Sequence, residues 1–308
     1  GRFSYGWANG TRPGSTASSI ENKLVTWEKN GNLNTGIEAS MFGGRLTSTI
    51  EYYSRRTRDM LLNNPLAISS GFSGYDDNVG SMVNRGLETS FRGVIFDRSN
   101  FHWDASLMLS MNRNKVTELT SSQDVINYGS VVIEKGKPIY TFYMSKSAGV
   151  SPSTGRQLYY AYYRYAVDKT GSIVTEKCDE YVTDNVGLAS LSKYYYGSRQ
   201  ALFSGSFSSN FTFFKNFDFS FLTTFSVGGN IYDSLYGGAM NVTYAGNNWH
   251  KNVLRRWQQP GDITDVPLVE IGGSRSSTGE ELIDASYFAI KNITLGYTLP
   301  SSLTKKAG

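Results

Sequence analysis

The chain has 308 residues, a mean hydropathy of −0.34 and a net charge of +4, from 30 basic and 26 acidic side chains. This mild balance, without a basic cluster, argues against a nucleic-acid-binding protein. No apolar run approaches the roughly 18–20 residues that a membrane-spanning helix needs, so a membrane protein with this sequence would have to be a closed β-barrel. The single cysteine, Cys178, cannot form an internal disulfide, and we expect an inert loop thiol.

The first alternating segments predict a hairpin. Apolar and polar side chains alternate over residues 34–42, a Gly43-Gly44 pair suits a two-residue turn, and residues 45–58 return. Side chains alternate between the two faces of a strand, so one face of this hairpin is polar. In a barrel we expect the polar face to line the lumen, with candidate lumen residues Glu51, Tyr53 and Arg55.

The next two strands are predicted over residues 79–95 and 101–112, joined by a short connection at 96–100. Their polar faces add further candidate lumen residues: Glu88, Arg92, His102 and Asp104. The only other histidine, His250, lies far along the chain, so we expect His102 to be a solvated wall residue rather than a metal ligand.

The most regular pattern predicts a tall hairpin, Phe203–Phe213 and Phe217–Val227, with a turn at Lys215-Asn216. Strands of ten or more residues exceed the usual strand length in soluble proteins and suit a wall that crosses a bilayer. We expect the aromatic face to contact lipid through Phe203, Phe207, Phe211, Phe217, Phe219, Phe221 and Phe225. A soluble β protein would instead bury this row in a core.

Short and long connections alternate along the chain. The connections at 43–44, 96–100 and 215–216 are short, whereas those at 59–78, 115–198 and 230–285 are long and read as largely irregular loops before a last strand at 287–299. Successive connections of a hairpin barrel lie on opposite rims, and short periplasmic turns with long extracellular loops are typical of outer-membrane barrels. The sequence therefore predicts an all-β, antiparallel transmembrane barrel wall.

Tyrosines concentrate in the long connections. They could form aromatic platforms for cargo or contacts with a lid protein, or they could belong to an interfacial girdle or pack between strands. The candidate contact residues are Tyr159, Tyr160, Tyr162, Tyr163, Tyr194, Tyr195 and Trp257.

The sequence shows no catalytic constellation, cofactor motif or metal-ligand spacing, which predicts a non-enzymatic protein. Glu280 and Glu281 are adjacent and are expected to be solvated loop charges rather than a catalytic pair. Asp262 and Asp265 could hold calcium, but we expect a turn in which carboxylates bind nearby backbone groups.

Several segments resemble the SusC/RagA family of TonB-linked outer-membrane proteins of Bacteroidota. The similar motifs begin at Leu24-Val25-Thr26-Trp27-Glu28 and Asn34-Thr35-Gly36-Ile37-Glu38, and continue through residues 51–61, 78–88, 256–267 and 286–300. They are ordered and spread along the chain, whereas residues 124–198 match weakly, as expected for variable outer loops. The motifs cover roughly the C-terminal third of a family member.

The resemblance implies that residues 1–308 are the C-terminal portion of a 22-stranded barrel, with the plug and the N-terminal extension that meets TonB outside this chain. It further implies import of bulky glycans or peptides across the bacterial outer membrane, beneath a SusD-like lipoprotein lid. A passive porin or adhesin barrel stays an alternative, and a soluble secreted carbohydrate-binding β protein is another.

Overall fold

The computed structural model describes residues 2–9, 12–119, 124–243 and 246–300. Strands dominate these ranges, which confirms the all-β expectation. No helix in the described ranges has both the length and the hydrophobicity that crossing a membrane requires.

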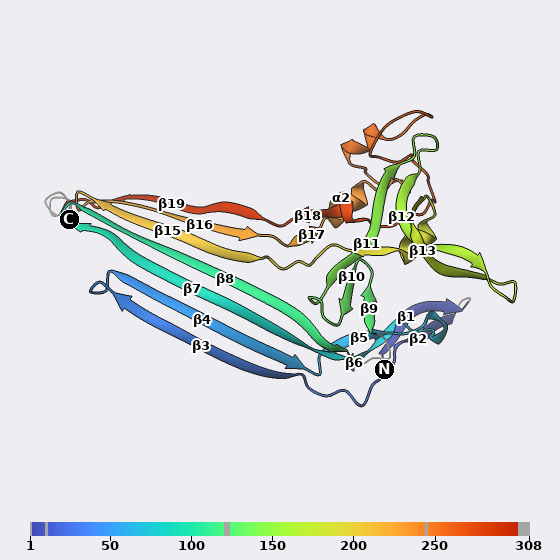
Figure 1. The fold of residues 1–308 in the computed structure, drawn as a ribbon, viewed down its shortest axis with the longest axis horizontal. Coiled ribbons are helices and arrows are strands. Elements are labelled where there is room, and N and C mark those ends of the chain that lie inside the picture. The colour runs from blue at the N-terminus through green and yellow to red at the C-terminus, as the bar shows by residue number, and fades with distance from the viewer. Residues whose placement is uncertain (1, 10–11, 120–123, 244–245, 301–308) are drawn as a thin grey trace.

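A long antiparallel sheet of seven strands forms one half of the molecule (Figure 1). Each pair of neighbours is antiparallel. Short turns join consecutive strands at one end of the sheet, and longer connections join them at the other end. In spatial order the strands are β19 (Tyr287–Tyr297), β16 (Phe217–Val227), β15 (Phe203–Phe213), β8 (Phe101–Leu119), β7 (Gly80–Arg98), β4 (Leu46–Arg58) and β3 (Lys29–Met41).

The predicted strand bounds are confirmed for β15 and β16, whereas β7 and β8 extend to 19 residues each. The predicted two-residue turn at Gly43-Gly44 is wrong, because Met41 pairs with Leu46 and leaves a four-residue loop. Phe42, Gly43 and Gly44 all have positive φ there, a conformation that glycine adopts without steric cost.

The segregation of short and long connections is confirmed. In Figure 1 the turns β3–β4, β7–β8 and β15–β16 lie at one end of the sheet, and the three long connections gather at the other. The expectation that the long connections are largely irregular is wrong. They contain β5 (Leu61–Pro65), η1 (Ile68–Ser70), β6 (Gly74–Asn78), β9 (Val125–Tyr128), β10 (Val131–Glu134), β11 (Thr141–Val150), β12 (Gln157–Val167), β13 (Ile173–Thr183), α1 (Val186–Leu191), β14 (Lys193–Tyr195), β17 (Asn230–Tyr232), α2 (Ser234–Ala239), η2 (Lys251–Arg255), η3 (Gly279–Glu281) and β18 (Leu282–Asp284).

We call the folded unit formed by the segment from β9 to β14, which includes α1, and the segment from β17 to β18, which includes α2, the head. Its second sheet has the order β13-β12-β11-β10-β9, and β14 pairs with β11. The head holds most of the buried apolar side chains, in clusters around Phe142 and Met144 and around Val242 and Val266. A separate hairpin, β1 (Arg2–Asn9) and β2 (Arg12–Ser19), lies at the same end of the sheet.

The head is attached to the sheet by a small core and one asparagine. Val79 and Val116 from the sheet end pack against Ile126 and Ile133 from β9 and β10. Nearby, the buried Asn114 side chain donates to Asn84 Oδ1 over 2.9 Å and accepts the backbone N–H of Ile139 over 2.7 Å. Because a buried amide costs free energy unless it is hydrogen-bonded, this geometry fixes how β8 enters the head.

Candidate functional site

The apolar face of the sheet contains all seven predicted lipid-facing phenylalanines. The register pairs Phe211 with Phe219 and Phe213 with Phe217, which places the aromatic residues of β15 and β16 on one side. The row continues into β8, where the Trp103 ring stacks on Phe211 with centroids 5.4 Å apart. The indole N–H donates to Ser209 Oγ over 2.8 Å, so this polar atom is satisfied within an apolar row.

This apolar face spans the whole seven-stranded sheet and is exposed. The same register adds Leu295 and Ile293 on β19 and Ile50 and Ile37 on β4 and β3. Leu295 is 75% exposed and Ile37 is 71% exposed, and no described element packs over them. Monomeric soluble proteins rarely expose contiguous apolar patches of such extent, so this face requires an apolar environment or a partner.

The opposite face contains all seven predicted lumen residues: Glu51, Tyr53, Arg55, Glu88, Arg92, His102 and Asp104. Glu51 lies directly across from Glu88, and Tyr53 lies across from Gly86, where its hydroxyl donates to Asn112 Oδ1 over 3.0 Å. This face is mainly polar, with Met108 and Leu222 as apolar exceptions, which is the arrangement expected of a wall between lipid and water.

His102 and Asp104 form a polar cluster near the short turns. Asp104 is largely buried and accepts a hydrogen bond from Asn210 over 3.1 Å, with Arg92 at 3.9 Å. His102 Nδ1 lies 3.2 Å from Asp97, and its Nε2 lies 3.7 Å from Asp104. Across the described ranges, no group of three or more His, Cys, Asp and Glu side chains is arranged to hold a metal ion.

The tyrosines predicted to lie in loops lie on strands of the head. Tyr159, Tyr160, Tyr162 and Tyr163 belong to β12, and Tyr194 and Tyr195 belong to β14. Tyr159 is 1% exposed, so its ring cannot serve as an open platform, and burial raises the pKa of its hydroxyl. Cys178, expected in a loop, likewise lies on β13.

Several of these tyrosines have partners inside the head. The Tyr162 hydroxyl donates to the Lys193 carbonyl over 2.7 Å, and the Tyr194 hydroxyl donates to Glu180 over 2.7 Å. Lys146 Nζ lies 4.2 Å from the centre of the Tyr160 ring, a cation–π contact. These contacts support the alternative in which the rings pack between strands, although Tyr195 is still 48% exposed.

Trp257 anchors the motif segment that precedes the last strand. Its ring lies against Gly155, where a Cβ atom would come within 2.4 Å of the indole, and its N–H donates to the Pro152 carbonyl over 3.0 Å. Asp262 accepts the backbone N–H groups of Gln258 and Gln259 over 2.9 and 3.0 Å. The expected turn, in which a carboxylate binds its own backbone, is therefore confirmed for Asp262.

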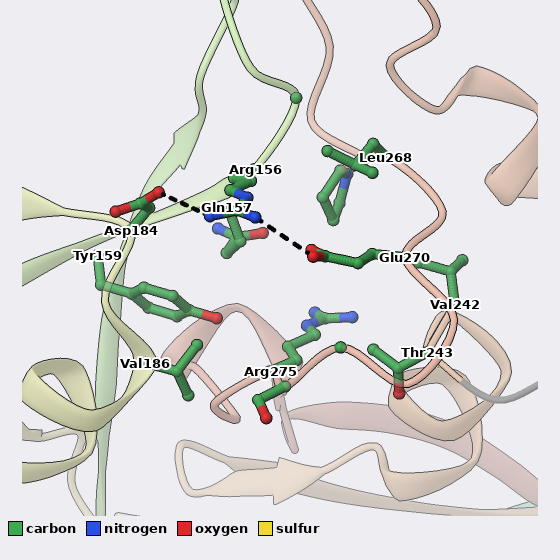
Figure 2. A pocket seen from close by; sticks show the side chains of 14 residues that line it. Arg156, Gln157, Tyr159, Asp184, Val186, Val242, Thr243, Leu268, Glu270 and Arg275 are labelled. Carbon is green, nitrogen blue, oxygen red and sulfur yellow. Dashed lines mark hydrogen bonds and ion pairs between the residues drawn. The ribbon is translucent and has the colours of Figure 1, made fainter.

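A cavity of about 200 Å³ opens in the head between β12 and the segment that follows Trp257. Figure 2 shows Arg156 between Asp184 and Glu270, with Arg275 and the Tyr159 hydroxyl facing the same space. Arg156 lies 3.5 Å from Asp184 and 3.4 Å from Glu270. Because the cavity brings charged and apolar side chains together, we take it as the candidate binding site of the head.

Beside Arg275, Glu281 is buried, so the expectation of a solvated pair is wrong for Glu281, whereas Glu280 is exposed as expected. Glu281 is 8% exposed, lies 3.3 Å from Arg275 and accepts the Tyr232 hydroxyl over 2.6 Å. The sequence analysis missed both arginines of the cavity. Nothing near Arg156 or Arg275 in the sequence marks them, because distant segments bring them together only in the folded head.

The comparisons with known proteins agree with the fold. No model of a known protein family matches the chain. The chain is 28% identical to TonB-dependent receptor P39 of Formosa agariphila over 98% of its length, and 27% identical to TonB-dependent receptor SusC of Bacteroides thetaiotaomicron over 90%. It spans only between a quarter and a third of these relatives, covering 32% of P39 and 26% of SusC.

A solved structure of the RagAB peptide transporter superposes with a TM-score of 0.75 at 27% identity, covering 98% of this chain and 32% of that chain. The RagAB peptide importer in the "closed-closed" state gives a TM-score of 0.72, also at 27% identity, with the same coverage of both chains. The resemblance inferred from the motifs is thereby confirmed. Over most of its length the chain is similar to TonB-dependent receptors of the SusC type, and its fold is similar to that of the RagAB transporter.

Proposed function

We propose that this chain is part of the wall and the outer end of an outer-membrane importer for bulky nutrients, either glycans or peptides. The observation that carries the proposal is the two-faced sheet, apolar and exposed on one side and polar on the other across seven strands. Such a sheet separates lipid from a watery lumen. Energy from TonB would enter through a region of the protein outside this chain.

The head lies at the end of the sheet where the long connections gather, and we assign this end to the cell exterior. A SusD-like lipoprotein would cover it as a lid. Two neighbours support a mobile assembly of this kind, since they are named as the RagAB peptide importer in "closed-closed" and "open-open" states. This chain would then supply part of the surface that the lid meets.

The exposed apolar face disfavours the soluble carbohydrate-binding alternative. That alternative requires the row around Phe207 and Phe211 to lie in a core, whereas the buried apolar clusters lie in the head and at its junction with the sheet. A passive porin or adhesin would have the same two-faced wall, so only an experiment can distinguish it from an importer.

The test is affinity purification of the intact, detergent-solubilised protein from its native outer membrane, followed by mass spectrometry. We expect a lipoprotein of the SusD type in near-stoichiometric amount, and nutrient uptake that stops when TonB is deleted. An unrelated barrel with the same tag serves as the control. Recovery of the barrel alone, with an open pore in conductance traces and uptake independent of TonB, would establish the porin alternative instead.

A further inference from the structure

One arginine that lines the cavity in the head, Arg275, has a buried hydrogen-bond donor that lacks an acceptor. Among the described residues, Nε of Arg275 has no hydrogen-bond partner although the atom is buried. The other nitrogens of this side chain contact the Met240 carbonyl over 3.4 Å and Glu281 over 3.3 Å. Charge-assisted hydrogen bonds are usually about 2.7–2.9 Å long, so both contacts are loose. An unsatisfied buried donor in a native protein calls for an explanation.

The second guanidinium group of the cavity is also loosely held. Arg156 lies 3.5 Å from Asp184 and 3.4 Å from Glu270, one carboxylate on each side. A guanidinium has five N–H donors in a planar fork that matches a carboxylate bidentately. Figure 2 shows both side chains reaching the same space from opposite walls. The cavity therefore offers donors from two cations, while its own two carboxylates are already occupied by Arg156.

The Tyr159 hydroxyl adds a third donor. It accepts the backbone N–H of Ser276 over 3.2 Å, which leaves its own proton available to a ligand. The remaining lining includes the apolar side chains of Val186, Val242 and Leu268. At about 200 Å³, the space holds on the order of six waters. It therefore fits a single amino-acid or sugar unit, but not a longer peptide or glycan chain.

We propose that this cavity binds a carboxylate-bearing end group of the cargo, held by Arg275, Arg156 and the Tyr159 hydroxyl. The proposal rests on the proposed import function and names the chemistry that the head would recognise. A carboxylate accepts hydrogen bonds from the two guanidinium groups, whose present contacts are loose, and its small apolar or sugar body fits the Val186, Val242 and Leu268 wall. A uronic acid and a peptide C-terminus share this chemistry, and the test distinguishes them.

The test is isothermal titration calorimetry on the intact, detergent-solubilised protein with two matched pairs of probes. One pair is methyl glucuronoside and methyl glucoside, and the other is N-acetyl-alanine and its amide. We expect heat of binding from the carboxylate member of one pair and none from its neutral partner. The pair that binds identifies the source of the carboxylate.

Three variants place the binding in this cavity. Arg156→Gln removes one guanidinium, and Ser274→Glu adds a repelling charge at an exposed lining residue while both arginines stay. Each change should weaken binding by about 10- to 100-fold, the value of one charge-assisted hydrogen bond. Arg164→Gln is the matched control, because Arg164 also lies on β12 and pairs with a glutamate, Glu176, but lines no part of this cavity.

Equal binding of the neutral probes, no binding of any probe, or unchanged affinity in folded Ser274→Glu protein would overturn the proposal. A thermal unfolding curve matching the parent protein identifies variants that are folded. Different results would contradict the proposed import function, namely the absence of a lipoprotein partner and uptake that does not depend on TonB. If the protein bound the carboxylate probe but had neither a lipoprotein partner nor TonB-dependent uptake, the cavity would still be a carboxylate site. The barrel would then have a function other than the proposed import.

Discussion

At the scale of single residues, a side chain that packs closely against a glycine explains why the motif at residues 78–88 contains glycine at position 86. In the polar face of the sheet, a Cβ atom at Gly86 would come within 2.3 Å of the Tyr53 ring. The tyrosine therefore lies flat across the neighbouring strand and reaches Asn112 on β8. Aromatic coverage of a strand glycine of this kind pins the register of three adjacent strands.

Replacing Gly86 with valine should displace Tyr53 and break its bond to Asn112. The expected loss is about 1–3 kcal/mol of unfolding free energy, the usual cost of overpacking. Urea unfolding of the barrel in lipid vesicles measures it. Gly93→Ala in the same strand is the control, because its nearest side-chain atom lies 3.5 Å away, an ordinary contact. Equal losses in both variants would show that the Tyr53 contact is not what requires glycine.

At the scale of elements, the two faces of β15 should respond oppositely to the same charge. Phe211→Arg places a cation on the apolar face and should cost roughly 2–4 kcal/mol if the residue lies near the bilayer midplane. Ser208→Arg, on the polar face of the same strand, should be tolerated. The measurement is the yield of heat-modifiable barrel in outer-membrane fractions. Normal assembly of Phe211→Arg would remove the lipid assignment of this face.

The tip of the β12–β13 hairpin should respond to acid. Asp168 accepts hydrogen bonds from the Thr170 hydroxyl and from the N–H groups of Thr170 and Ser172, and these lower its pKa below the ordinary value of 3.8. A lowered folded-state pKa stabilises the turn above the ordinary value, and this stabilisation is lost as the pH falls through the folded-state pKa.

Hydrogen exchange at Thr170 and Ser172, corrected for the intrinsic pH dependence, should therefore show protection at pH 6 that disappears in strong acid. Asp168→Asn keeps an acceptor oxygen but removes the charge, so its protection should be lower at pH 6 and nearly independent of pH. Protection in the parent protein that stays constant down to pH 2 would show that the carboxylate does not hold this turn.

At the scale of the whole molecule, Asn114 connects the wall to the head. Its bonds to Asn84 within the sheet and to Ile139 in the head are the kind of buried contact whose loss leaves unpaired polar groups. Asn114→Ala should lower the unfolding free energy by about 1–3 kcal/mol. It should also speed proteolytic cleavage between sheet and head. Asn127→Ala, at an exposed asparagine of β9, should change neither measurement.

The sequence predicted the wall well and the head poorly. The bounds of Phe203–Phe213 and Phe217–Val227 were recovered because alternation follows from the local geometry of consecutive residues. Tyr159 was expected in a loop, yet it lies buried in a strand of the head. The tyrosines there stand in two adjacent pairs around Ala161, without the alternation that marks a half-buried strand. Glu281 was expected in solvent for a similar reason, since its partners Arg275 and Tyr232 cannot be read from its own neighbours.

By itself, the sequence determined the all-β class, the two-faced wall, the segregation of turns from long connections, and the resemblance to SusC/RagA receptors. These properties depend on the order of neighbouring residues, which alternate across a strand or form a turn. Only the tertiary structure decided that the long connections fold into a head, that Trp257 packs on Gly155, and that Arg156 and Arg275 share one cavity. Contacts of that kind join segments that lie far apart in the sequence, so the order of neighbouring residues does not reveal them.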